Sequence, residues 1–132
     1  MVFSYRVSLQ VWHPDTDPER MIAGIGRPAR RHWKVGEERT TPNGTPLPGT
    51  YRESYCVFDL GEGDDGQLAA FLRRTLVELE HAAEFISDLR RTGGKVGYYV
   101  SWFPGDHGET FDADLIAGMA RLGLDFGVEP VC

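Results

Sequence analysis

Residues 67–103 read QLAAFLRRTLVELEHAAEFISDLRRTGGKVGYYVSWF and join the longest helix signal in the chain to a strand signal. From Gln67 to about Arg91, apolar residues recur at the three- and four-residue spacing of an amphipathic helix. They are Leu68, Phe71, Leu72, Leu76, Leu79, Ala83, Ile86 and Leu89. Such a helix is about 35 Å long at 1.5 Å per residue, enough to cross a whole sheet. Gly93-Gly94 ends it, and between Lys95 and Phe103 the apolar period falls to two, as in a strand.

The segments on either side continue the alternation of strands and helices. Strands are expected at residues 3–11, 32–36, 51–60 and 124–128, and helices at residues 18–25 and 111–122. Pro18 at the first helical position leaves Asp17 as the N-cap, while Thr16 with Glu19 forms a competing capping box. The proline-rich segment Thr40–Thr50 is predicted to be a long, stiffened loop.

The resulting order is β-α-β-β-α-β-α-β. Its first six elements match the split β-α-β arrangement of ferredoxin-like domains, and one further α-β unit follows them. We therefore expect an α+β sandwich with a mainly antiparallel sheet and helices on one face.

The composition limits the class of protein. The chain has 132 residues with 14 Lys+Arg and 20 Asp+Glu, so its formal net charge is −6. This length suits a single domain, which we place at residues 1–132. An acidic balance argues against a general binder of nucleic acid or anionic membranes, because both need a positive field. No apolar run approaches the roughly 20 residues that span a bilayer.

Two cysteines bear on the cellular compartment. Cys56 lies in a strand-like run and Cys132 is the last residue, a poor pair for a disulfide staple. Residues 1–12 lack the basic region and long apolar stretch of a signal peptide. We therefore expect a cytoplasmic protein with reduced thiols.

Short motifs of one known family occur along the whole chain. They are Tyr5-x-Val7-x-Leu9, Asp17-Pro18-x-x-Met21-Ile22, Gly26-x-Pro28, Trp33-x-x-Gly36-Glu37-x-Arg39, Gly93-Gly94 and Leu122-x-Leu124-Asp125. Together they resemble the bacterial domain-of-unknown-function family 4279. The family has no established activity, so the resemblance implies no reaction. Members that look like this are suggested to be immunity or partner-binding proteins.

One basic island stands out in the acidic chain. Arg27, Arg30, Arg31, Lys34 and Arg39 outnumber Glu37 and Glu38 by 5 − 2 = +3, with Trp33 among them. Arginine forks pair bidentately with carboxylate or phosphate, so Arg30, Arg31, Trp33 and Arg39 are the candidate binding residues. The alternative is a solvated turn whose arginines pair with acids of the same chain.

Two groups of residues could support catalysis. His13, Asp15 and Asp17 cluster in the sequence, and His107 follows another strand, so all four could hold a divalent metal or act as acid and base. The competing explanation is that the aspartates cap a helix and His107 lies in an exposed turn. Cys56 could be a nucleophile with His32 or His81 as base, but a thiol in an apolar strand is usually a small core filler.

The residues favour a non-enzymatic protein that recognises another protein through the arginine and aromatic segment and the proline-rich loop. A long loop restricted by prolines loses little entropy on binding. The alternative is a small-ligand or metal-dependent enzyme with a His/Asp site at one end of the sheet. No cofactor, nucleic-acid partner or membrane association is expected. A homodimer is compatible with an uncovered sheet face or edge.

Overall fold

A five-stranded sheet forms the centre of the computed structural model, which describes residues 1–132. Its strands, in spatial order, are β2 (Arg31–Trp33), β5 (Ser54–Gly63), β1 (Ser4–His13), β6 (Lys95–Phe103) and β7 (Asp125–Pro130). All neighbours are antiparallel except β6 and β7, which run parallel. The expected α+β class with a mainly antiparallel sheet is therefore confirmed.

The central strand β1 owes its position to its alternating sequence. Val7, Leu9 and Val11 are fully buried, while Ser8 and Gln10 between them face the other side. Leu9 lies opposite Phe58 on β5 and Tyr98 on β6, so both neighbours add apolar residues to the same face.

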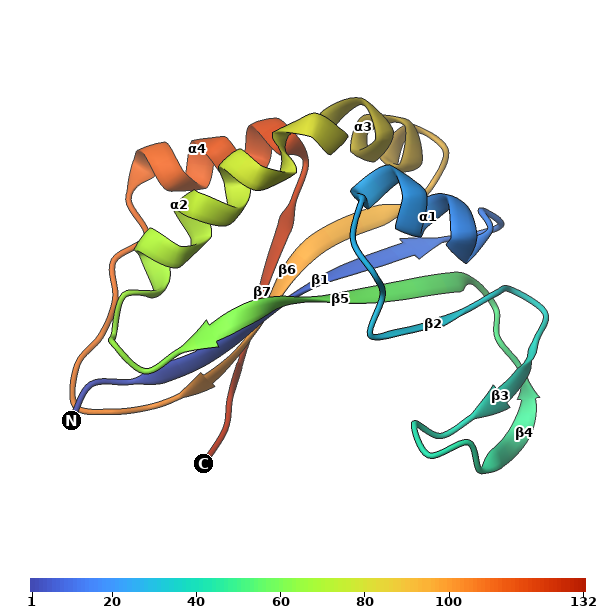
Figure 1. Cartoon of the computed structure of the whole chain (residues 1–132), viewed down its shortest axis with the longest axis horizontal. Helices are drawn as coiled ribbons and strands as arrows, with labels where there is room; N and C mark the ends of the chain where they lie inside the picture. The colour runs from blue at the N-terminus through green and yellow to red at the C-terminus, as the bar shows by residue number, and fades with distance from the viewer.

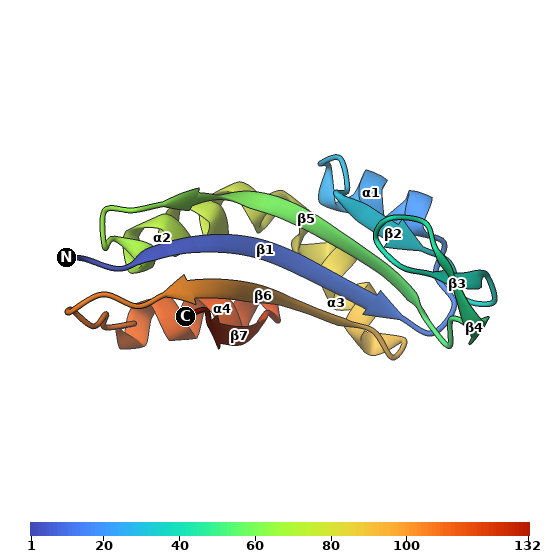
Figure 2. The same cartoon turned by 90° about the horizontal axis from the view of Figure 1, so that it is seen from below.

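Helices cover only that apolar face. They are α1 (Pro18–Ile25), α2 (Leu68–Leu79), α3 (Ala83–Arg91) and α4 (Ala113–Leu122). Figure 1 shows all of them on one side of the sheet, and Figure 2, seen from below, shows the strands in front of the helices. We call the uncovered side the open face. No helix of the chain has both the length and the apolar character needed to cross a membrane.

The ends of α1 and α4 follow from local sequence. The Asp17 carboxylate accepts a hydrogen bond from the Glu19 N–H at 3.0 Å, which decides between the two predicted caps. The Asp112 carboxylate accepts one from the Leu115 N–H at 2.9 Å. Gly26 and Gly123 end these helices with φ of 78°, a conformation that glycine adopts without strain.

The single helix expected from Gln67 to Arg91 is instead two helices joined by a 3₁₀ turn, Glu80–Ala82. The break coincides with a contact to another element. The two ring nitrogens of His81 lie 2.8 Å from the Glu78 carbonyl oxygen and 3.0 Å from the Ile25 carbonyl oxygen at the end of α1. Apolar periodicity carries no information about this contact.

The segment expected as a loop contains a β-hairpin. Strands β3 (Glu38–Thr40) and β4 (Pro46–Thr50) form a separate two-stranded sheet beyond the edge strand β2. We call residues 38–50 the arm; in Figure 1 it extends away from the helices at one end of the sheet. Prolines are tolerated in β4 because this strand has a free edge, where no partner needs the missing N–H.

Candidate functional site

A groove on the open face brings together three neighbouring strands and the arm. Its volume is about 520 Å³. It is lined by Gln10 and Trp12 of β1, Tyr55 and Val57 of β5, Arg31 and Trp33 of β2, the preceding Arg30, and Pro42 of the arm. We call this set the aromatic–arginine groove.

Strand register places the aromatic rings side by side. Trp12 lies opposite Tyr55, and Tyr55 lies opposite Trp33, so one ring comes from each of three adjacent strands. Val11 and Cys56 are fully buried in the core, and alternation therefore turns Trp12 and Tyr55 to the open face.

The rings form one connected cluster. Trp12 and Tyr55 have ring centroids 4.1 Å apart, and Trp33 and Tyr55 are 4.5 Å apart. Trp33 also stacks on Tyr51 at 4.2 Å with an interplanar angle of 8°. Its indole N–H donates to the Glu53 carbonyl oxygen at 3.1 Å. Several such contacts fix Trp33 and give the groove a rigid aromatic wall.

The two groove arginines are held differently. The Arg31 guanidinium lies 5.0 Å from the centre of the Trp33 ring and donates to the Thr40 carbonyl oxygen at 2.7 Å. Arg30 is exposed, and its side chain forms no ion pair or hydrogen bond within the chain. Other members of the basic island are paired: Arg27 with Glu78 at 3.1 Å and Lys34 with Asp17 at 3.6 Å.

The tyrosines report the local electrostatics. Burial raises the pKa of Tyr55, and the nearby charges of Arg30 and Arg31 oppose that rise. The Tyr51 hydroxyl exchanges hydrogen bonds with the Thr40 backbone, both at 3.1 Å, and the bond from the Thr40 N–H lowers the pKa of Tyr51. Arg31 and Arg39 lower it further, so positive charge extends from the groove to the base of the arm.

Three of the four candidate binding residues meet in this groove, and Arg39 does not. Arg39 lines a neighbouring hollow with Tyr51 and Arg52, and it donates to the Pro48 carbonyl oxygen at 3.2 Å. Trp12 and Tyr55 were not among the candidate binding residues predicted from the sequence, although Trp12 could be expected either in the core or on an aromatic-lined sheet face. Trp12 follows Ser8 and Gln10 on the polar face of β1, and this aromatic residue in a polar series is the signal that could have revealed it.

The four residues of the His/Asp alternative do not form one site. His13 ends β1, whereas His107 follows β6, and these strands are antiparallel neighbours. The two histidines therefore lie near opposite ends of the sheet. Asp17 caps α1, and the exposed His107 lies 2.7 Å from the Asp106 carboxylate in a turn.

His13 has a structural environment of its own. It is buried, and its Nδ1 accepts from the N–H groups of Asp15 and Thr16 at 3.1 and 3.0 Å. The proton is thereby assigned to Nε2, which lies 2.8 Å from the Thr92 hydroxyl oxygen. These bonds tie the turn after β1 to the end of α3.

Cys56 lies directly opposite His32 in the ladder, but its thiol points into the core. Burial, together with the nearby charges of Glu19 and Asp17, raises the pKa of Cys56 to about 12. Its sulfur lies 3.7 Å from the Pro18 carbonyl oxygen, and His81 is engaged with two carbonyl oxygens elsewhere. This environment disfavours the thiolate that nucleophilic catalysis requires.

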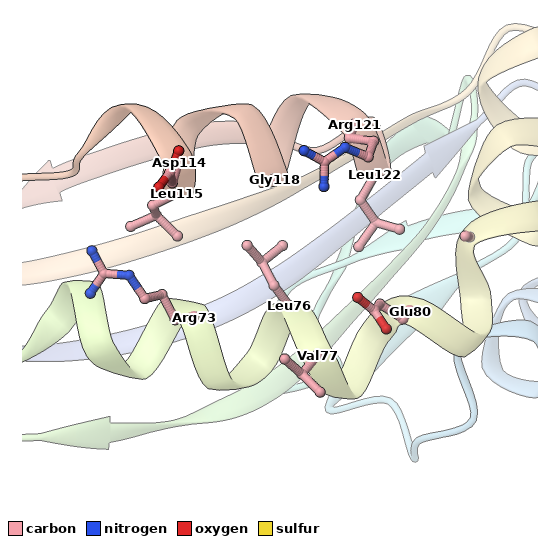
Figure 3. Close-up of a pocket in the computed structure, with 10 residues that line it drawn as sticks. Arg73, Leu76, Val77, Glu80, Asp114, Leu115, Gly118, Arg121 and Leu122 are labelled. Carbon is pink, nitrogen blue, oxygen red and sulfur yellow. The ribbon is translucent and has the colours of Figure 1, made fainter.

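A second groove of about 370 Å³ lies between α2 and α4 on the helical side. Figure 3 shows Leu76, Leu115 and Leu122 pointing between the two helices, with Val77 turned away. Charges of both signs surround it, and Arg73 pairs with Asp112 at 2.6 Å across the helices. No aromatic side chain lines this groove, so none of its charged residues lies against an aromatic wall as Arg30 does in the aromatic–arginine groove.

Comparison with known proteins identifies no relative. No family, curated protein or solved structure matches the chain.

Proposed function

We propose that this chain is a non-enzymatic binding protein that recognises another protein through the aromatic–arginine groove and the arm. One observation carries the proposal: Trp12, Trp33 and Tyr55 meet Arg30 on the sheet face that no helix covers. Trp, Tyr and Arg are the residues that most often dominate the energy of protein interfaces.

The arm supports the same conclusion. Every residue of β4 is exposed, and no member of the 23-residue core cluster lies between Ile25 and Cys56. The arm is nevertheless ordered, by the Tyr51 and Arg31 bonds to Thr40 and by the prolines. A segment that is ordered before binding loses little entropy when a partner arrives.

Fold and family are part of the proposal. The spatial order β2-β5-β1-β6 is that of a ferredoxin-like sheet, with α1 and α2–α3 as crossovers and β7 appended by α4. This supports a ferredoxin-like assignment. The sequence motifs support membership of family 4279 and an immunity-like role, in which the partner is a second protein. The two reduced thiols support a cytoplasmic location.

Site-specific photo-crosslinking tests the function. A photo-reactive phenylalanine analogue is placed at position 42 in the groove wall and, as a control, at the exposed position 116 on α4. Irradiation of producing cells should attach one identifiable protein to position 42 only. Calorimetry with that purified protein should then show at least tenfold weaker binding for Arg30→Ala. Equal crosslinking at both positions, or none, contradicts the proposal.

A further inference from the structure

The lining of the aromatic–arginine groove identifies the chemistry of its occupant. We propose that it takes an acidic segment of the partner protein, with a carboxylate on Arg30 and an adjacent aromatic or aliphatic side chain against Trp12. This inference rests on the proposed function and adds the class of partner surface.

The charge of the groove lining favours an acidic ligand. The chain carries 20 Asp+Glu, yet no acidic residue lines the groove, whereas two arginines do. Arg31 is already engaged by Thr40 and by the Trp33 ring. Arg30 therefore remains as an unpaired guanidinium at the groove wall, and its fork can take a carboxylate bidentately.

The apolar wall of the groove favours an aromatic or aliphatic side chain next to that carboxylate. Trp12 is half-buried and lines the groove together with Tyr55, Val57 and Pro42 of the arm. A side chain that fills this space would be largely removed from water, which also strengthens the neighbouring charge contact. A cationic group is disfavoured, because Arg31 already lies over Trp33 and Arg30 repels it.

The rest of the open face argues against a polynucleotide. Asp59, Glu62 and Glu129 lie on that face further along the strands, opposite Ser8, Arg6 and Ser101. A phosphate backbone running along the sheet would meet these carboxylates. In addition, one face of the Trp33 ring is already stacked on Tyr51, so that face cannot stack on a nucleotide base.

Selection from a random 12-residue peptide display library on the purified protein tests the proposal. Enriched peptides should contain Asp or Glu next to Phe, Tyr, Trp or Leu. Their affinity should fall at least tenfold in Arg30→Ala and should fall as salt is raised. The matched control is Arg121→Ala, which removes another exposed arginine, from α4 on the helical side. NMR shifts should locate the bound peptide at the Trp12 and Trp33 indole signals.

The other outcomes separate the two proposals. Enriched peptides that bind in the groove but lack acidic residues overturn this inference and leave the proposed function intact. No enrichment, together with no crosslinked protein at position 42, overturns both. Binding of an oligonucleotide in preference to every peptide, or self-association through the groove that Arg30→Ala abolishes, also overturns the inference.

Discussion

The two cysteines differ in their exposure to solvent. Cys56 is fully buried, and burial raises its pKa to about 12, while Cys132 is exposed at the end of the chain. We expect a maleimide reagent to label the native protein once, at Cys132. Mass spectrometry of digested protein checks this assignment. Rapid labelling of Cys56 under native conditions contradicts the burial argument.

Cys56 also makes stability depend on alkaline pH. An unfolded thiol loses its proton near pH 8.5, whereas the native Cys56 keeps it up to about pH 12. The stabilisation that the protonated Cys56 thiol contributes to the folded state is therefore complete below pH 8.5. It declines between pH 8.5 and about pH 12, by at most about 1.4 kcal/mol per pH unit. Urea unfolding between pH 8 and 10.5 should show a shallower decline for Cys56→Ala than for the wild type. Cys132→Ala, which removes the exposed thiol, should follow the wild type.

Residue-level expectations succeed where the controlling partner is close in sequence. Asp17 could be predicted as a cap because its acceptor role involves Glu19, two residues away. The separation of His13 from His107 depends instead on the relative direction of β1 and β6, which the residues around either histidine do not determine. Tyr55 was missed for a similar reason, since its place in the groove is set by two neighbouring strands.

At the scale of elements, two glycines that lie within helices can be compared. A Cβ at Gly24 of α1 would overlap the Phe85 ring of α3, whereas one at Gly118 of α4 would reach only the Leu76 methyl end at 3.2 Å, beside an open groove. Alanine is normally favoured over glycine in a helix by roughly 0.5–1 kcal/mol. We therefore expect Gly118→Ala to stabilise by about that amount.

Gly24→Ala should instead destabilise the folded protein. The ring must move or turn out of its half-buried place, and overpacking of this kind costs about 1–3 kcal/mol. Urea unfolding of both variants measures the two signs in the same protein. Equal stabilisation by both substitutions would show that the Phe85 ring does not pack closely against Gly24.

Asp112 at the start of α4 should stabilise the fold in a way that is lost at acidic pH. The bond from the Leu115 N–H and the Arg73 guanidinium lower the pKa of Asp112. A depressed carboxyl pKa stabilises the fold at neutral pH, and this stabilisation is lost as pH falls through the native pKa. Asp112→Ala should lower Tm by a few degrees at pH 7. Asp112→Asn keeps the cap without the charge, so its deficit should be smaller and should disappear at low pH.

The sequence predicts whether most segments are helices or strands, but it predicts their first and last residues less well. The strand Lys95–Phe103 was expected with its observed ends, since its alternation is uninterrupted. The helix break at Glu80–Ala82 was not, because His81 contacts the Ile25 carbonyl oxygen 56 residues away. The arm was expected as a loop because its prolines disfavour a sheet interior, yet a two-stranded sheet has only edges.

Across the whole molecule, the core and the binding features occupy separate parts of the chain. The core cluster draws on residues up to Ile25 and from Cys56 onward, while the arm and five of the eight residues that line the aromatic–arginine groove come from the segment between them. Stability and recognition are therefore separable by substitution. This separation was not visible from apolar content, because Trp12 and Tyr55 belong to core-forming strands but face away from the core.

Deletion of the arm tests that separation. The Tyr51 N–H donates to the Glu37 carbonyl oxygen at 3.0 Å, so these residues are already adjacent and a two-residue Asn-Gly turn can replace residues 38–50. The core loses no member, and a shorter loop offsets part of the lost hydrogen bonding. We expect the free energy of unfolding to change by less than about 1 kcal/mol, with a single cooperative transition in urea. Binding of the crosslinked partner should be lost, because the deletion removes Pro42 from the groove wall. A loss above about 3 kcal/mol, or a broadened transition, would instead make the arm part of the structural framework.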